Sequence, residues 1–437
     1  MRNLLLVTRN FAPTSHVSVE RAIKLAKYLP EFGWRPTVLT GTRATAGLAE
    51  DPELLDQVRG VEVIRARAPE FSWFYGGMSK GSNAPLKQRG APRRGILHPK
   101  SWIIPDSQVL WFRFAVRAAL RRARSAQWEA VLATSFPPTT ILIAHKVASR
   151  LGIPYVADFR DSWTRYHNTP HRPALLAEFE RRLELKMIRD AAAVVTVQTS
   201  FVEHALARIA PADRPPLHLI RNGYDEDDFR AAQPAELPRF SIVHTGQLRR
   251  SPAPLWEALG HALAERPELR GQVHFWQVGF VDARAIPVLE APPEGVAVHH
   301  VPWVSQREAI GYMLGADLLL VEEFQGIMPS KTMQYLRASR PILAFLDEGR
   351  DICDVLEAAD EAHLVKRTEA RRAGSLIAAL ASRPRASSST PSAAVAVYSR
   401  REIGRHFAAV LDAACGQPYR PAGPQPRPEL TPAKNAF

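Results

Sequence analysis

Residues 322–345, EEFQGIMPSKTMQYLRASRPILAF, decide the fold. The apolar run 318–321 before them predicts a buried strand, and residues 341–345 predict a second strand. An irregular loop and a short helix are expected between the two, with Ser330 capping the first free backbone N–H groups of the helix. A strand, a loop, a helix and a further strand are the repeating unit of an α/β protein with a parallel sheet.

Two polar side chains on this expected helix suggest a ligand-binding site. Lys331 falls in the first turn, and Gln334 follows one turn later on the same face. A helix start offers free N–H groups and a partial positive charge, and Lys331 adds a full charge, which together suit the diphosphate of a nucleotide. An ordinary strand–loop–helix of an α/β core is the alternative interpretation.

The stretch resembles the donor-binding signature of family 4 of the GT-B glycosyltransferases. That signature has a proline, a lysine and then a glutamate that opens "EYLAxGxPVLA". The family's ribose-binding glutamate is replaced by Gln334, and a second glutamate eight residues earlier is replaced by Gly326. An amide still forms hydrogen bonds, but without charge. The resemblance is carried by Pro329, Lys331, Gln334-Tyr335-Leu336 and Arg340-Pro341-Ile342-Leu343-Ala344.

Two further segments carry the resemblance. Residues 195–206 and 218–229, VTVQTSFVEHAL and HLIRNGYDEDDF, are similar to the family's "VTVSxxLAExL" and "VIPNGYDxxDF", which close its first domain. Residues 240–245 and the GQLRR loop after them are similar to its "YTGxL" element. The resemblance therefore implies that Gly246 and either Arg249 or Arg250 lie at the donor phosphates. It also implies that Val304 lies in the loop that packs on the nucleobase, and that Pro329, Ser330 and Gln334 bind the donor.

The acceptor side is expected in the first half of the chain. A strand over 3–8 and a helix over 18–32 are joined by a loop that carries Ser15 and His16, where the family often has glycines. Such a lone loop histidine either contacts a phosphate or an acceptor hydroxyl, or has no function.

A second acceptor-side segment follows the strand expected at 153–159. It carries Asp158, Arg160 and Asp161 in the sequence DFRDSW, which resembles the same segment of many family 4 enzymes. Ligands gather at the carboxyl ends of parallel strands, so Asp161 is expected to accept a hydrogen bond from the attacking sugar hydroxyl. Alternatively, Arg160 pairs with Asp158 and only holds the loop.

The resemblance covers residues 3–414 in matching order and implies the GT-B architecture. This is an α/β fold of two Rossmann-like domains that face each other across a cleft, with a C-terminal helix that crosses back to the first domain. The expected order is an acceptor-side domain over 1–229, a linker over 230–239, a nucleotide-sugar-binding domain over 240–395, a crossing helix over 396–415 and a disordered tail over 416–437.

Positive charge is concentrated in the first half of the chain. The net charge is +13, and residues 1–200 carry 30 Lys and Arg against 16 Asp and Glu. A helix that Asp106 or Ser107 is expected to cap places Arg113, Arg117, Arg121 and Arg124 in one stripe, as in a basic helix that lies on anionic lipid. The alternatives are a solvated arginine face and an arginine-rich composition. No nucleic-acid-binding motif accompanies the charge, so nucleic acid is not expected as a partner.

Several classes are excluded or disfavoured by missing patterns. The sequence has no GxSxG, no Walker loop and no paired metal-ligand spacing, and its two cysteines make no disulfide framework. The N-terminus predicts a strand instead of a signal peptide, and no apolar run reaches the roughly 20 residues of a membrane span. We therefore expect a cytoplasmic protein without cofactor or metal, peripheral at most on the inner face of the cytoplasmic membrane.

The resemblance implies a glycosyltransferase that moves a sugar from a UDP- or GDP-sugar to a glycan or lipid-linked acceptor. Retention of anomeric configuration and a place in surface polysaccharide or glycoconjugate biosynthesis are expected. Lys331 with Arg249 or Arg250 would stabilise the leaving group. Two alternatives stay open: a catalytically degenerate binding or scaffold protein, since both donor-site glutamates are missing, and a non-hydrolysing nucleotide-sugar 2-epimerase of the same fold.

Overall fold

The fold is taken from a computed structural model, which describes residues 1–15, 17–42, 49–69, 99–164, 172–302, 304–323, 328–346, 350–385 and 391–419. Its contacts divide the chain into two compact units. Unit 1 comprises the described residues up to Asn222 together with those from Arg400 onward, and unit 2 comprises the described residues from Gly223 to Ser399. The helix that follows Ser399 thus returns to unit 1, as expected for a crossing helix.

Unit 1 is built on a seven-stranded parallel sheet in the order β5-β3-β1-β6-β7-β8-β9. The strand order reverses between β1 and β6, which makes this the switch point where ligands of doubly wound sheets bind. A small antiparallel pair, β2 (Thr14–Ser15) and β4 (Ala49–Glu50), lies outside the main sheet. The seven strands are β1 (Arg2–Val7), β3 (Trp34–Gly41), β5 (Glu62–Ala66), β6 (Ala130–Ser135), β7 (Tyr155–Phe159), β8 (Ala193–Thr196) and β9 (Leu217–Leu219).

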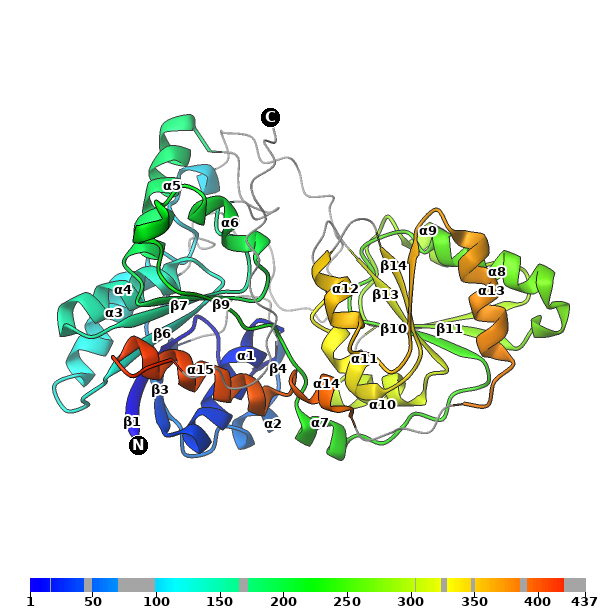
Figure 1. The fold of residues 1–437 in the computed structure, drawn as a ribbon, viewed down its shortest axis with the longest axis horizontal. Coiled ribbons are helices and arrows are strands. Elements are labelled where there is room, and N and C mark those ends of the chain that lie inside the picture. The colour runs from blue at the N-terminus through cyan, green and yellow to red at the C-terminus, as the bar shows by residue number, and fades with distance from the viewer. Residues whose placement is uncertain are drawn as a thin grey trace. The chain divides into compact units, whose positions relative to one another are not determined.

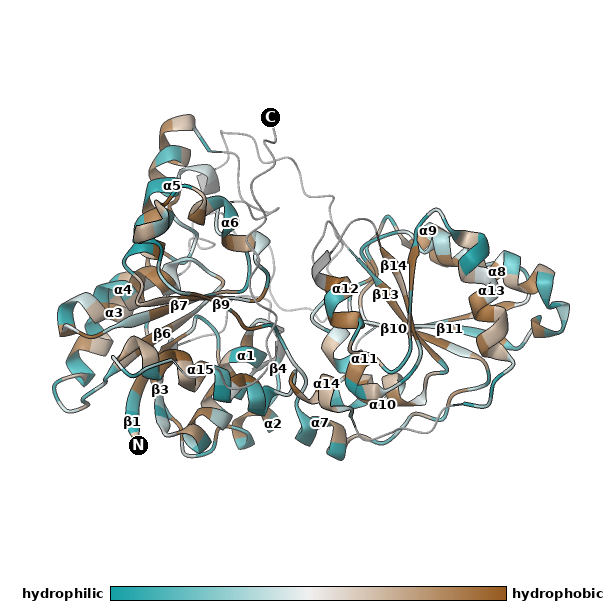
Figure 2. Cartoon of the chain, viewed as in Figure 1, coloured by the Kyte–Doolittle hydropathy of each residue, from teal (hydrophilic) through white to brown (hydrophobic). Residues whose placement is uncertain are grey.

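Helices cover both faces of this sheet (Figure 1). On one face α3, α4, α5 and α6 close a core with alternate residues of the central strands, and on the other α1 and α15 close a second core. The strand interiors are the most hydrophobic part of the unit (Figure 2). The helices are α1 (Val17–Tyr28), α2 (Glu53–Asp56), α3 (Trp111–Arg122), α4 (Thr139–Leu151), α5 (Ala174–Arg189), α6 (Ser200–Leu206) and α15 (Arg400–Ala414), and short 3-10 turns include η1 (Leu29–Phe32) and η3 (Pro99–Trp102).

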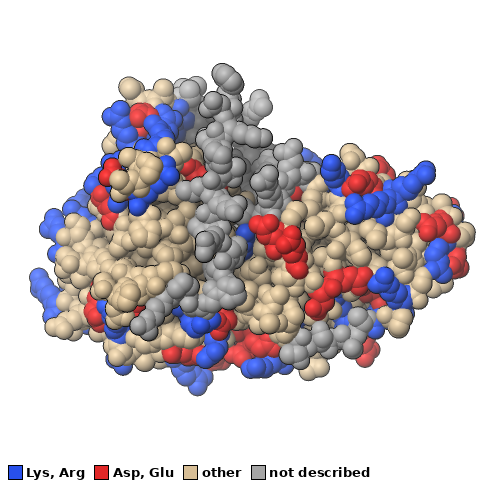
Figure 3. Space-filling view, viewed as in Figure 1, with Lys and Arg blue, Asp and Glu red and all other residues tan. Residues whose placement is uncertain are grey.

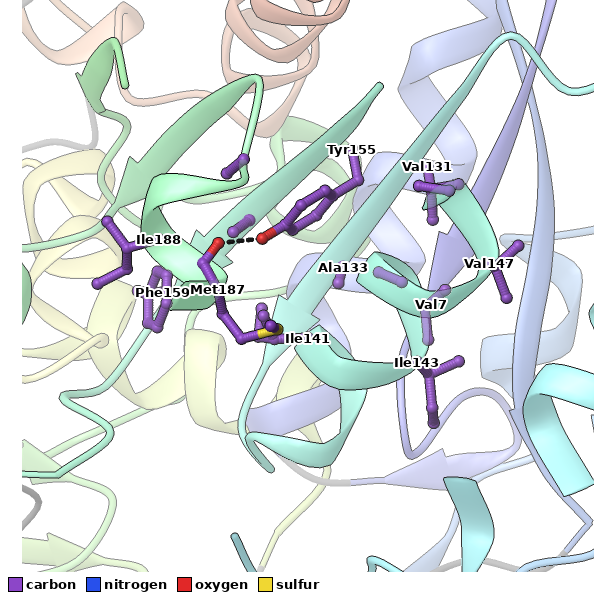
Figure 4. Packing of buried hydrophobic residues seen from close by; sticks show 14 of the residues in the cluster. Val7, Val131, Ala133, Ile141, Ile143, Val147, Tyr155, Phe159, Met187 and Ile188 are labelled. Carbon is purple, nitrogen blue, oxygen red and sulfur yellow. Dashed lines mark hydrogen bonds between the residues drawn. The ribbon is translucent and has the colours of Figure 1, made fainter. Parts of the chain in front are cut away.

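The packing beneath α4 and α5 illustrates the first core (Figure 4). Val131 and Ala133 of β6 meet Ile143 and Val147 of α4. At the α5 side, the buried Tyr155 hydroxyl donates a hydrogen bond to the Met187 carbonyl. Burial raises the pKa of Tyr155 above its usual value, so this hydroxyl stays protonated and acts as a donor.

Unit 2 repeats the design with a six-stranded parallel sheet in the order β12-β11-β10-β13-β14-β15. This is the Rossmann order 3-2-1-4-5-6, and its switch point lies between β10 and β13. Helices α8 and α13 cover one face, and α10, α11 and α12 cover the other. The strands are β10 (Ser241–Thr245), β11 (Val273–Val278), β12 (Val296–Val301), β13 (Leu318–Glu322), β14 (Ile342–Leu346) and β15 (Ala362–Lys366). The helices are α7 (Glu226–Ala231), α8 (Ala253–Glu265), α9 (Ile286–Leu289), α10 (Gln306–Gly315), α11 (Thr332–Ala338), α12 (Arg350–Leu356), α13 (Ala370–Ala381) and α14 (Ala393–Ala396).

The structure corrects two expected helix caps. Helix α11 begins at Thr332, with Lys331 and not Ser330 at the N-cap and no side-chain cap. Helix α3 begins at Trp111, with Leu110 at the N-cap, so neither Asp106 nor Ser107 caps it. Instead, the Asp106 carboxylate accepts 2.8 Å hydrogen bonds from the backbone N–H and hydroxyl of Thr139, at the start of α4.

Candidate functional site

Lys331 lies at the switch point of unit 2. Its Nζ donates a 2.5 Å hydrogen bond to the Thr245 carbonyl at the end of β10 and also contacts His244 Nε2. Burial of the amine lowers the pKa of Lys331 to about 7, an effect that Arg249 reinforces and Glu322 opposes. The Lys331 amine lies at the carboxyl end of β10 and has a pKa near neutrality. Such an amine is suited to bind an anionic ligand.

A buried chain of hydrogen bonds continues from Lys331 beneath the loop after β10. His244 Nδ1 lies 2.6 Å from Gln277 Oε1, and Gln277 Nε2 donates a 2.9 Å hydrogen bond to the Gly246 carbonyl. Burial, followed by the charge of Lys331, holds the pKa of His244 well below its usual range, so its imidazole is neutral. The carbonyl of Gly246 and the amine of Lys331 are therefore fixed by one network.

Two glycines let the loop come this close to the next strand. Gly246 has φ +90° and Gly279, which follows β11, has φ +123°. A Cβ on Gly279 would lie 2.4 Å from the Gly246 carbonyl oxygen. The sequence therefore needs glycine at Gly279 for the close approach and at Gly246 for its backbone conformation.

Charged side chains from other strand ends join Lys331. Glu322 ends β13 with its side chain buried, and Arg367 follows β15 with a guanidinium nitrogen 3.7 Å from the Glu322 carboxylate. The Arg367 guanidinium also donates to the Ser251 carbonyl in the loop after β10. Arg249 lies on that loop, is exposed, and acts electrostatically on Lys331. The sequence analysis named Lys331 and Arg249 but not His244, Gln277, Glu322 or Arg367.

The remaining donor-side candidates lie in the same unit. Pro329 and Ser330 immediately precede Lys331, and Gln334 is one turn further along α11, all three being half-buried. Val304 is half-buried before α10 and packs on the core beside that helix. Arg250 is half-buried next to Arg249. Tyr335, one residue after Gln334, accepts a 2.9 Å hydrogen bond from the Thr245 backbone N–H, and so ties α11 to the end of β10.

The acceptor-side candidates of unit 1 lie around the end of β7. The Asp158 carboxylate is fully buried, and both its oxygens accept 2.9 Å hydrogen bonds from Arg21 of α1. A direct contact of Asp158 with an acceptor would require this pair to open. Arg160 donates to the carbonyls of Ser135, at the end of β6, and Ser18 in α1, so it joins the switch point to the first helix.

Asp161 is the acceptor-side candidate with a half-buried carboxylate near the surface. Burial lowers the pKa of the adjacent Arg160, whereas the carboxylates of Asp158 and Asp161 raise it, which places Asp161 within the field of that guanidinium. Ser15 forms part of β2, and His16 lies outside the described residues. Among the residues that the structure describes, no three His, Cys, Asp or Glu side chains are grouped to hold a metal ion.

Comparison with known proteins finds a family match in unit 1. Residues 19–223 match the model of the glycosyl transferase 4-like domain, a match that spans α1 to β9 and thus most of unit 1. The chain carries a glycosyl transferase 4-like domain and has the GT-B fold. The resemblance is confirmed for the fold and for a glycosyl transferase 4-like domain, and the matched model lies in unit 1, outside residues 322–345. A comparison of the sequence with curated proteins gives no match.

Solved structures support the fold over nearly the whole chain. Trehalose 6-phosphate synthase from Burkholderia multivorans superposes with a TM-score of 0.56 at 12% identity, covering 94% of this chain and 99% of its own. Sucrose-phosphate synthase from Thermosynechococcus elongatus gives 0.54 at 14% identity and 95% of each chain. HepE from Anabaena in complex with UDP gives 0.53 at 13% identity, covering 94% and 100%. At these identities the likeness shows the fold alone.

Proposed function

We propose that the protein transfers a sugar from a nucleotide-sugar donor, a UDP- or GDP-sugar, to a glycan or lipid-linked acceptor. The observation that carries the proposal is the seating of the Lys331 amine beside the Gly246 loop at the switch point of unit 2. Doubly wound sheets bind nucleotides at this point. The chain also carries a glycosyl transferase 4-like domain, and such a transferase would use a nucleotide sugar as its donor.

The roles of the donor-side residues follow from the bond that breaks. When the bond between the anomeric carbon and the diphosphate oxygen is cleaved, negative charge grows on the departing diphosphate. Lys331 and the neighbouring Arg249 or Arg250 would stabilise that charge, which is the main source of catalysis in such a site. We assign this role to side chains of the protein and invoke no cofactor. Gln334 would hold the donor ribose through its amide, with Pro329, Ser330 and Val304 lining the nucleotide.

The acceptor hydroxyl would complete the reaction on the same face of the sugar, with retention of anomeric configuration. Asp161 would accept a hydrogen bond from this hydroxyl as it attacks, and Arg160 would hold the loop that carries Asp161. His16 and Ser15 would line the acceptor. The setting that we propose is the biosynthesis of surface polysaccharide or glycoconjugate at the cytoplasmic side of a membrane.

A lipid-linked acceptor would make docking on an anionic membrane useful. Arg113, Arg117 and Arg121 are exposed on α3, and Arg124 is exposed just after its end. Basic residues near an anionic surface contribute about 1 kcal/mol each. No helix among the described residues is long and apolar enough to cross a membrane. On the face drawn in Figure 3, Lys and Arg side chains lie in small groups among uncharged atoms. The membrane proposal rests on these four arginines and on the positive charge of residues 1–200.

The test is a panel of UDP- and GDP-sugars incubated with the protein, in the presence and absence of glycan and lipid-linked acceptors. We expect nucleotide release that depends on both donor and acceptor and that survives removal of divalent cations with EDTA. Conversion of the donor at carbon 2 without an acceptor would instead identify an epimerase. Tight nucleotide binding without turnover on any donor would identify a degenerate binding protein.

A further inference from the structure

The network behind Lys331 fixes the tautomer of a buried histidine. Gln277 donates its amide N–H to the Gly246 carbonyl, so its Oε1 is the atom that faces His244. An amide oxygen only accepts, so His244 Nδ1 must carry the ring proton and donate it. His244 is neutral, because burial and Lys331 depress its pKa. Its Nε2 is therefore an unprotonated acceptor directed at the Lys331 amine.

The amine of Lys331 thus has two acceptors on β10, namely His244 Nε2 and the Thr245 carbonyl. An uncharged amine has two N–H groups, and these two acceptors take both of them. An ammonium group has a third N–H, which by tetrahedral geometry points away from these two acceptors. The third N–H is the one that a donor phosphate would accept.

Charged and titratable side chains from the elements around Lys331 also act on its amine. Glu322 of β13 favours the charged amine, and Arg249 of the loop after β10 disfavours it. The ring of Tyr335 on α11 lies 5.8 Å from Nζ. Arg367, beyond β15, approaches Glu322 at 3.7 Å and shares its charge. His244 and Thr245 accept hydrogen bonds from the amine and so direct it.

We propose that His244 is a positioning residue, which seats the Lys331 amine through Nε2 so that Lys331 takes up a proton when the donor diphosphate binds. This inference rests on the proposed function, because it takes the diphosphate to be the ligand of Lys331. His244 does not touch the donor. Gln277 acts behind it by fixing the Nδ1–H tautomer, and the same amide holds the Gly246 carbonyl in place.

The affinity for the donor is expected to depend on pH. The pKa of Lys331 is about 7 in the free protein. The diphosphate requires the charged amine, so binding raises this pKa and takes up a proton when the pH is above 7. By linkage the affinity for the donor is constant below pH 7 and falls above it, by about tenfold per pH unit in the limit.

A matched pair of variants distinguishes the roles of the two ring nitrogens of His244. In His244→Asn the amide is attached at Cγ, where it replaces Nδ1 and keeps the contact with Gln277 but leaves Lys331 without its acceptor. In His244→Gln the amide is attached at Cδ, near the position of Nε2, and restores an acceptor for Lys331. The ammonium group of Lys331 is less stabilised in His244→Asn, so its pKa is expected to fall.

The experiment is calorimetry with UDP-glucose and GDP-glucose from pH 6 to pH 9, in two buffers of different ionisation enthalpy. These diesters lack the terminal phosphate that titrates near pH 6, so proton uptake reports the protein. We expect uptake that approaches one proton above pH 7 in the wild type and is absent in Lys331→Met. His244→Asn is expected to lose about tenfold in affinity at pH 7, with the break in its pH profile moved to lower pH, whereas His244→Gln stays near the wild type.

A second readout needs no ligand. The rate at which acetic anhydride acetylates Lys331, followed by mass spectrometry across the same pH range, gives the pKa of the free amine. We expect a lower pKa in His244→Asn than in His244→Gln. Binding of a nucleotide sugar without proton uptake, or equal pH profiles and acetylation rates for the two His244 variants, would overturn the inference and leave the proposed function standing. Absence of binding by any nucleotide sugar would overturn the proposed function itself.

Discussion

Arg21 and Asp158 form a two-hydrogen-bond ion pair inside unit 1, with both bonds 2.9 Å long and side chains 1% and 0% exposed. Arg21 also donates to the carbonyls of Ile220 and Arg221, just after β9. Its guanidinium carbon lies 4.9 Å from the centre of the Phe407 ring in α15. One arginine of α1 thereby links the end of β7, the segment after β9 and the C-terminal helix.

Asp158→Asn is predicted to destabilise the protein strongly. It leaves the Arg21 guanidinium buried and uncompensated, which typically costs about 3–5 kcal/mol. Denaturant unfolding checks this, with Glu178→Gln on α5 as the control. It is expected to change stability by less than about 1 kcal/mol, because the half-buried Glu178 pairs with the exposed Arg181 and Arg182 at the surface. Equal stability of the two variants would mean that the Arg21 pair does not hold unit 1 together.

Gly279→Ala is predicted to displace the Gly246 loop and to lower donor turnover. The new Cβ would meet the Gly246 carbonyl oxygen at 2.4 Å in a backbone conformation with φ +123°. The control is Gly260→Ala in α8, where a Cβ meets nothing within 4 Å. This control is expected to stabilise the protein by about 0.5–1 kcal/mol without affecting turnover. Unchanged turnover in Gly279→Ala would show that the close approach is unimportant for donor binding.

Gln334→Glu is predicted to be tolerated and to bind nucleotide at least as tightly as the wild type. Gln334 is half-buried on α11, one turn after Lys331. A carboxylate at that position would accept a stronger, charge-assisted hydrogen bond from a ribose hydroxyl. Calorimetric titration with UDP and GDP measures the effect. Weaker binding in the variant would argue that Gln334 does not face the ribose.

The double variant Arg117→Glu/Arg121→Glu is predicted to lose salt-sensitive binding to anionic vesicles. Salt near 150 mM screens charges beyond about 8 Å, so the wild type should bind reversibly and release as salt increases. Co-sedimentation with anionic and neutral vesicles measures this. The control is Arg371→Glu/Arg372→Glu, exposed on α13 of unit 2, which is expected to bind as the wild type does. Equal binding by both double variants would show that the arginines of α3 form an ordinary solvated surface and do not bind the membrane.

Local sequence patterns predicted many elements closely. The strand expected over 3–8 is β1 at Arg2–Val7, and the strand expected at 153–159 is β7 at Tyr155–Phe159. Periodicity and turn residues are local signals, so they fix such elements. The cap expected at Asp106 or Ser107 was wrong because α3 begins only at Trp111, and the Asp106 carboxylate accepts a hydrogen bond from Thr139, 33 residues away.

The candidate site was predicted only where a motif marks it. Lys331 and Arg249 were found from the family resemblance, and the structure brings them together. His244 and Gln277 each look like one polar residue in a buried strand, and only the pairing of β10 with β11 aligns them. Glu322 and Arg367 end different strands, 45 positions apart in the sequence. No local pattern indicates that two such residues meet.

Lys331 is proposed to stabilise the leaving diphosphate of a nucleotide sugar. The most direct measurement is the rate of nucleotide release by Lys331→Ala with saturating acceptor, compared with the wild type and with Lys186→Ala, an exposed lysine of α5. We predict a loss of about 10²-fold or more in Lys331→Ala, because a charge that faces the developing negative charge is removed, and no loss in Lys186→Ala. Turnover of donor by Lys331→Ala at the wild-type rate would show that Lys331 does not stabilise the leaving diphosphate.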